Sequence, residues 1–157
     1  MSSGDGSRAP DPLRRRGETL WRGGDETAGF TVRIDRPRSI LRMTFWGYWR
    51  NEVGFAYRDA MFAAIVEISR MPGWDVLADL TRYPAQNATV QKCHADTMVR
   101  SQASPTFRRA ANLVDNTLSE MQIRRLSSES GLPLVAFFQD ESKAIAWLHS
   151  QAQLSPP

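Results

Sequence analysis

The stretch near the C-terminus constrains the fold of this chain most strongly. Residues 132–138 form an almost uninterrupted apolar run, and Asp140 follows at a position that suits a helix cap. Apolar side chains then recur at helical spacing, at Ala144, Trp147 and Leu148. A buried strand that leads directly into a helix is typical of a sheet covered by helices. We therefore expect an α/β fold.

Composition limits the classes of function. The chain has 157 residues, of which 41% are apolar and 24% charged, so one domain with a single core is expected. The net charge is +3, and the basic run Arg14-Arg15-Arg16 is flanked by acids, so we expect no nucleic-acid partner. No apolar run approaches the roughly 20 residues that span a bilayer, so no integral membrane segment is expected.

The single cysteine and the polar N-terminus indicate a location. Cys93 has no second cysteine to pair with inside the chain, and the polar N-terminal residues lead us to expect no secretory signal. These features favour a cytoplasmic protein. Residues 1–28 are rich in Gly, Ser, Arg and Asp, which predicts a disordered arm that could dock through Leu20 and Trp21. The folded domain is expected at 29–150, followed by a loose tail at 151–157.

The first half of the domain predicts a hairpin followed by a helix. Residues 30–35 and 40–46 alternate between apolar and polar side chains, which predicts two antiparallel strands with Trp46 in the core. Residues 51–71 predict a long amphipathic helix that Pro72-Gly73 ends. A strand at 74–80 follows, and then a helix from Thr89, expected as its N-cap, to about residue 104.

The second half repeats the alternation of strand and helix. Residues 110–114 predict a strand, and Asn116 or Thr117 is expected to cap a helix that Gly131 ends. The core candidates of this helix are Leu118, Met121 and Leu126. The whole order predicts a mixed sheet of four to five strands, with a leading antiparallel hairpin and then βα units joined by right-handed crossovers.

Residues 29–150 resemble the STAS-like fold, specifically the SpoIIAA-like group of bacterial anti-sigma-factor antagonists. Three stretches carry the resemblance: Gly47-Tyr48-Trp49 before the long helix, the strand at 74–80, and 134–138 together with 144–148. The resemblance implies a bacterial signalling module that acts by protein–protein interaction, without enzymatic activity and without a cofactor. In those antagonists a phosphorylatable serine lies in an Asp-Ser-Ser-Gly motif at the start of the second helix. That motif falls here on Asn87-Ala88-Thr89-Val90, in which only Thr89 retains a hydroxyl at the acceptor position.

The connection after the strand at 74–80 is the expected partner-binding segment. The resemblance implies partner contact here, with Asp79, Tyr83, Asn87 and Thr89 as the candidates. Asp79 also ends its strand at the carboxyl edge, where open α/β sheets bind ligands. Two of these residues have a structural alternative: Thr89 as a helix cap alone, and Asp79 as an acceptor for nearby N–H groups. The sequence does not identify the partner protein. It also does not decide whether the chain forms a homodimer through an edge strand or the first helix.

An aromatic group gives the alternative function. Trp46, Tyr48, Trp49 and Tyr57 could line a groove for a small molecule or a lipid, and six methionines suit irregular apolar ligands. The other interpretation is that they pack the end of the hairpin against the first helix. In either case at least one of Tyr48 and Trp49 is expected to be exposed, because both follow the strand.

No residue pattern indicates catalysis. Cys93 and His94 are neighbours on a predicted helix and point about 100° apart, which disfavours a shared proton or metal ion. We expect Cys93 to be a buried small apolar residue. The chain has no glycine-rich phosphate loop on a strand–helix unit and no nucleophile elbow. We expect no catalytic residue, no metal site and no cofactor.

Overall fold

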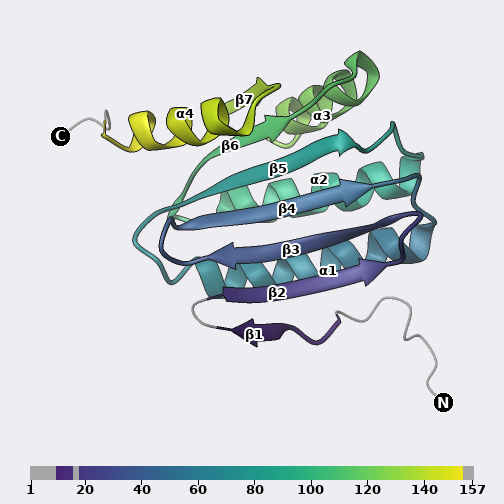
Figure 1. The fold of residues 1–157 in the computed structure, drawn as a ribbon, viewed down its shortest axis with the longest axis horizontal. Helices are drawn as coiled ribbons and strands as arrows, with labels where there is room; N and C mark the ends of the chain where they lie inside the picture. Colours follow the sequence, from purple (N-terminus) through teal and green to yellow (C-terminus); the bar gives the residue numbers. More distant parts are fainter. Residues whose placement is uncertain (1–9, 16–17, 154–157) are drawn as a thin grey trace.

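The computed structural model describes residues 10–15 and 18–153 as one seven-stranded sheet with four helices (Figure 1). The spatial order of the strands is their order along the chain. The strands are β1 (Leu13–Arg15), β2 (Glu18–Gly24), β3 (Gly29–Asp35), β4 (Ile40–Trp46), β5 (Trp74–Arg82), β6 (Phe107–Leu113) and β7 (Val135–Phe138). The helices are α1 (Asn51–Ile68), α2 (Ala88–Ala103), α3 (Thr117–Glu129) and α4 (Glu141–Gln153).

The sheet is mixed, as the sequence predicts. Strands β1 to β4 pair antiparallel, and β4 to β7 pair parallel. The crossovers β4–α1–β5, β5–α2–β6 and β6–α3–β7 supply the parallel part. The mixed α/β class is therefore confirmed, but the predicted number of four to five strands is wrong.

The additional strands lie in the segment expected to be a disordered arm. β2 pairs with β3 along its whole length, from Glu18 opposite Asp35 to Gly24 opposite Gly29. Trp21 is buried against α1 and β3, and one face of this strand is solvated. Few apolar residues therefore suffice to hold it, which explains why composition misled the prediction. Residues 1–9, also part of the expected arm, lie outside the described residues.

At the other end, α4 continues into the segment expected as a tail and ends at Gln153. Its predicted cap is confirmed: Oδ1 of Asp140 accepts hydrogen bonds from the Ser142 amide and hydroxyl, each 2.8 Å long. These bonds from Ser142 lower the pKa of the Asp140 carboxyl below its ordinary value.

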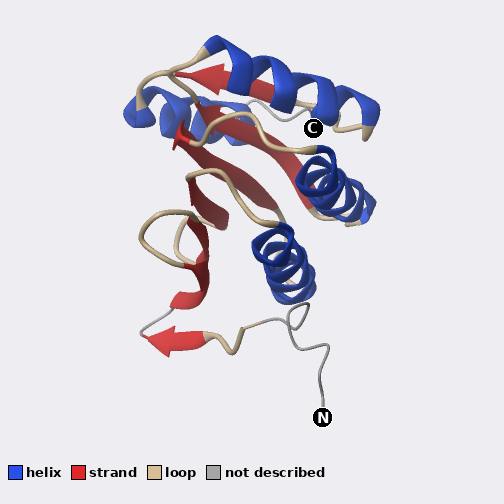
Figure 2. Ribbon diagram, turned by 90° about the vertical axis from the view of Figure 1, so that its right-hand side faces the viewer, coloured by secondary structure: helices blue, strands red, loops and turns tan. Residues whose placement is uncertain are grey.

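The helices cover the sheet unequally. Helices α1, α2 and α3 pack on one face, and α4 packs on the other face over β6 and β7 (Figures 1 and 2). The larger core lies under α1 to α3 and includes Phe30, Trp49, Tyr57 and Trp74. A smaller core under α4 includes Leu77, Ala111, Leu113, Ala144 and Leu148.

Three predicted core positions are corrected. Trp46 is only half-buried and points to the face opposite α1, because β4 places Phe45 in the main core. Leu118 and Met121 are exposed, at 69% and 60%. Helix α3 instead turns Ile123 and Leu126 inward, so Leu126 alone of its three predicted core residues is confirmed.

Candidate functional site at the carboxyl edge

The parallel strands β4, β5 and β6 end at one edge of the sheet, and each leads into a helix on the same face. We call this the carboxyl edge and define it by the connections 47–50, 83–87 and 114–116. Such edges are where open α/β sheets place their functional loops. The predicted partner-binding segment lies in the middle of this edge.

The Gln86 side chain joins two of these connections. Its Nε2 donates to the Gly47 carbonyl at 3.0 Å and to the Pro84 carbonyl at 2.7 Å. Its Oε1 accepts from the Trp49 amide at 2.8 Å. The side chain is buried, so these bonds are shielded from water and hold the β4–α1 and β5–α2 connections together.

Helix α3 is tied to the same residue. The Gln86 amide donates to Oε1 of Gln122 at 3.0 Å, and Nε2 of Gln122 donates back to the Gln86 carbonyl at 3.2 Å. The Ser119 hydroxyl donates to the Tyr83 carbonyl at 2.5 Å. The β5–α2 connection is therefore held on both sides. Sequence reasoning missed Gln86, because a glutamine in a polar loop carries no signal of burial.

Asn87, one of the predicted partner-binding residues, caps α2. Its Oδ1 accepts from the Val90 amide at 2.9 Å, and its Nδ2 donates to Oδ1 of Asn51 at 3.1 Å. The prediction that Thr89 is the N-cap is therefore wrong, since the helix begins at Ala88. Thr89 lies half-buried in the first turn of α2, with Asn87 immediately before that turn.

Tyr83 lies in the core rather than on the surface. Its ring is 3% exposed, and its hydroxyl lies 2.7 Å from Nε2 of His94. Burial raises the pKa of the Tyr83 phenol well above its ordinary value and lowers the pKa of His94 to about 3. Both groups are therefore neutral at pH 7, and the ring of Tyr83 offers no surface for a partner.

Asp79 is separated from the other three predicted residues. It lies on β5, on the face opposite α1 and α2, where Oδ1 accepts from the Thr81 amide at 3.0 Å and the Thr81 hydroxyl at 2.7 Å. This is the local role that the sequence left as an alternative. Of the predicted partner-binding residues, only Asn87 and Thr89 remain on the accessible part of the carboxyl edge.

The four aromatic groove candidates do not form one groove. Tyr48 is exposed and lines a hollow of about 430 Å³ between the β2–β3 turn and the start of α1. Trp46 lies on the open face of the sheet, and its indole N–H donates to the Asp25 carbonyl at 2.8 Å. Trp49 and Tyr57 are buried beside Phe45. The prediction that one of Tyr48 and Trp49 is exposed is confirmed.

A cavity of about 50 Å³ lies inside the main core. Its walls include Met43, Met61, Met98, Tyr57 and His94. Ligand pockets for small molecules usually measure about 300–1,000 Å³, so a lipid would not fit in this cavity. Cys93 is buried nearby, as expected, and burial raises the pKa of its thiol.

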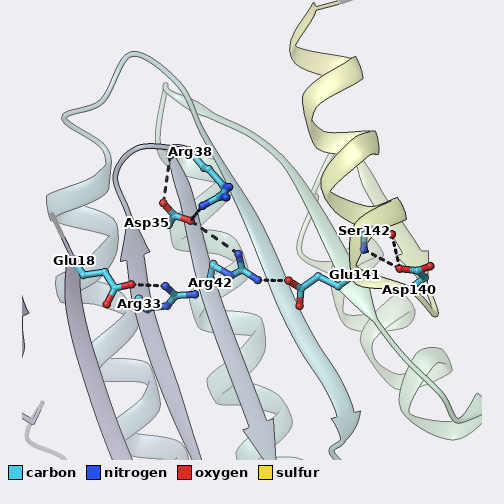
Figure 3. Close-up of polar contacts among 8 residues, drawn as sticks. All are labelled: Glu18, Arg33, Asp35, Arg38, Arg42, Asp140, Glu141 and Ser142. Atoms are coloured by element: carbon cyan, nitrogen blue, oxygen red, sulfur yellow. Dashed lines mark hydrogen bonds and ion pairs between the residues drawn. The ribbon is translucent and has the colours of Figure 1, made fainter. Parts of the chain in front are cut away.

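The open face of the sheet carries ion pairs between neighbouring strands (Figure 3). Arg33 on β3 pairs with Glu18 on β2. Arg42 on β4 lies 4.0 Å from Asp35 and 2.7 Å from Glu141, the first residue of α4. The Arg33–Glu18 and Arg42–Glu141 pairs are partly exposed to solvent, and surface pairs of this kind each stabilise a protein by at most about 1 kcal/mol. Their structural consequence is a polar face beside α4.

Two classes of function find no support within the part of the chain that the structure describes. Among those residues no group of three or more His, Cys, Asp and Glu side chains is placed to hold a metal ion. None of the described helices combines the length and apolar character needed to cross a membrane.

The mixed sheet with α1 to α3 on one face and α4 on the other defines a SpoIIAA-like fold. A solved structure with this fold is an uncharacterized protein of the DUF3478 family from Shewanella loihica. The two superpose with a TM-score of 0.56 at 16% sequence identity, over 87% of this chain and 97% of that one. No protein-family model matches the sequence, and no curated protein matches it significantly.

Proposed function

We propose that this chain is a non-enzymatic interaction module that binds a partner protein at the carboxyl edge. The observation that carries the proposal is a set of exposed apolar side chains on two connections of the carboxyl edge and on the start of α3. We call it the edge patch and define it by residues Tyr48, Pro84, Ala85, Leu118 and Met121, all of which are exposed.

Each residue of the edge patch is next, along the chain, to a residue that belongs to or bonds the Gln86 network. Tyr48 lies between Gly47 and Trp49, which both bond the Gln86 side chain. Leu118 precedes Ser119, which bonds the Tyr83 carbonyl, and Met121 precedes Gln122, which bonds the Gln86 backbone. Exposed tyrosine and methionine on a preorganised surface are typical of protein interfaces, because little conformational freedom is lost on binding.

Crosslinking inside the host cell tests this proposal. A photoreactive phenylalanine analogue at Leu118 should yield an adduct with one partner protein, and the same analogue at Val99 should not. Val99 is the matched control, since it is an exposed apolar residue on α2. Met121→Lys should remove the adduct at Leu118. Equal adducts at both positions, none at all, or an adduct with a second copy of this chain would overturn the proposal.

Phosphorylation at Thr89 is the finer form of this proposal. A phosphate there would lie in the first turn of α2, where backbone N–H groups and the helix dipole favour negative charge. The support is the resemblance to the antagonists together with the position of Thr89 beside Asn87. Peptide mass spectrometry of protein from its own host tests it: a phosphate on Thr89 is expected, and unmodified Thr89 under all growth conditions would contradict it.

The hollow beside Tyr48 supports a second candidate function, the binding of a small molecule. Its volume of about 430 Å³ lies within the usual range of ligand sites, and Val53 and Ala56 give it apolar walls. Native mass spectrometry after gentle purification should then show a bound small mass that Tyr48→Ala abolishes. Bare protein in both samples would exclude a tightly held ligand.

A further inference from the structure

The chain diverges at the ends of two adjacent strands. β6 and β7 pair in parallel, with Leu113 opposite Phe138, and both end at the carboxyl edge. From β6 the chain passes into α3 on the main-core face, and from β7 it passes into α4 on the opposite face. In open α/β sheets, ligands bind where the connections of two neighbouring parallel strands separate in this way.

A hollow of about 300 Å³ opens at this divergence. Its polar walls come from the β6–α3 connection, the first turns of α3 and the residue after β7: Asp115, Asn116, Thr117, Glu120, Arg124 and Gln139. Phe137 of β7 also lines it. The volume reaches the lower end of the range for ligand pockets, which suits a molecule of few atoms.

The charges in the hollow are nearly balanced. Arg124 bonds Glu120 at 2.5 Å, and its guanidinium lies 4.2 Å from the centre of the Phe137 ring. Asp115 adds one further carboxylate, opposed by the partial positive charge at the start of α3. The Ser119 amide of that helix end already donates to Oδ1 of Asn116 at 2.9 Å. A strongly charged ligand therefore finds no matching excess of charge.

The carboxylate, amide and hydroxyl side chains that line the hollow suit a ligand that carries hydroxyl groups. Carboxylate oxygens only accept hydrogen bonds, amide side chains both donate and accept, and the threonine hydroxyl does both. A molecule with several adjacent hydroxyls can bond both the acceptors and the donors among these groups, because each hydroxyl also donates and accepts. We propose that this hollow binds a neutral polyhydroxylated molecule of monosaccharide size, either a free sugar or the sugar of a nucleoside. The proposal is independent of the edge patch.

Two-dimensional amide NMR of the full chain tests the proposal, with D-glucose, D-ribose, adenosine and inorganic phosphate as probes. Saturable shifts confined to residues 114–124 and 137–141 are expected with a sugar. Shifts with D-glucose or D-ribose would identify a free sugar, and shifts with adenosine alone would identify a nucleoside. No saturable shift with any sugar probe, shifts spread over the whole surface, or shifts with phosphate alone would each overturn the proposal.

Two variants of α3 locate the site. Glu120→Gln should weaken sugar binding about tenfold, as expected for one hydrogen bond to a charged acceptor. Glu129→Gln is the matched control, since Glu129 forms the equivalent exposed pair with Arg125 on the same helix, 3.1 Å apart. Equal affinity of both variants would overturn the assignment. Asp115→Asn provides a second substitution within the hollow if Glu120→Gln perturbs the helix.

Discussion

The hydroxyl of Tyr83 lies 2.7 Å from Nε2 of His94, and both rings are buried among Phe45, Trp49 and Tyr57. The pair joins the β5–α2 connection to the body of α2, since Tyr83 follows β5 and His94 lies two turns into the helix. A polar pair at this place fixes the connection from the inside, while Gln86 fixes it at the edge.

Removal of the Tyr83 hydroxyl should destabilise the fold. Tyr83→Phe leaves Nε2 of His94 buried without this partner, and we expect the free energy of unfolding to fall by about 1–3 kcal/mol. Urea denaturation measures the change. Tyr48→Phe is the control. The Tyr48 ring is exposed, so removal of its hydroxyl should change the free energy of unfolding little. Equal effects of the two substitutions would show that the buried contact contributes nothing.

His94 should make stability depend on pH. Burial lowers its pKa to about 3 in the folded protein, against an ordinary value of 6.5. Between these values the unfolded chain binds a proton that the folded protein does not bind. The contribution of neutral His94 to the free energy of unfolding is therefore complete above pH 6.5. It decreases by about 1.4 kcal/mol per pH unit as the pH falls toward 3.

Two measurements check this pH dependence. Between pH 7 and pH 5 the contribution of His94 to the free energy of unfolding should fall by about 2 kcal/mol. The loss of stability over this interval should therefore be about 2 kcal/mol smaller in His94→Phe than in the unmodified protein. Independently of that variant, the ring nitrogen shifts of His94 in the folded protein should show a neutral imidazole at pH 5. A charged His94 ring in the folded protein at that pH would contradict the prediction.

Gln86 should be essential to the geometry of the carboxyl edge. Gln86→Leu removes the bonds to Gly47, Trp49 and Pro84, and we expect a loss of about 3 kcal/mol. Hydrogen exchange at the Trp49 amide should accelerate more than exchange at the centre of β5. Gln102→Leu, an exposed position on α2, is the control and should leave both quantities near their original values. Unchanged exchange at Trp49 in Gln86→Leu would show that the connection is held by other contacts.

Two glycines with left-handed backbones separate conformational strain from steric overlap. Gly47 has φ +76°, and an added Cβ would lie 2.1 Å from the Thr27 carbonyl oxygen. Gly131 has φ +78°, with no atom within 4 Å of its added Cβ. Gly131→Ala should therefore cost about 1 kcal/mol and Gly47→Ala about 3 kcal/mol, measured by chemical denaturation. Equal losses of stability in the two variants would mean that the backbone around Gly47 shifts enough to relieve the steric overlap.

Local patterns predicted much of the fold, because helix caps and apolar periodicity report on the nearest residues. Asn116 caps α3 and Asp140 caps α4, as two of the sequence patterns indicate. The Thr89 cap failed because Asn87 competes for the same role two residues earlier, and its carboxamide reaches the Val90 amide. Both side chains can cap a helix, so only the path of the preceding loop decides between them.

The candidate site was less predictable than the fold. Tyr83, a predicted partner-binding residue, lies in the core, whereas Gln86, which no sequence pattern marks, bonds two connections and a helix. The apolar character of Leu118 and Met121 predicts core positions on α3, yet Ile123 and Leu126 form its inward face. These outcomes depend on which neighbouring element each side chain meets, which no local pattern records.

By itself, the sequence determined the alternation of strands and helices, the ends of most helices and the α/β class, since these follow from hydrogen bonding and periodicity along the chain. The tertiary structure decided the rest. β2 is a strand because β3 offers it a complete row of partners, and α4 packs away from α3 because its apolar side chains Ala144 and Leu148 cover the opposite face of the sheet. Burial and distant pairing are properties of the assembled sheet, so the edge patch and the hollow at the ends of β6 and β7 exist only once the sheet has formed.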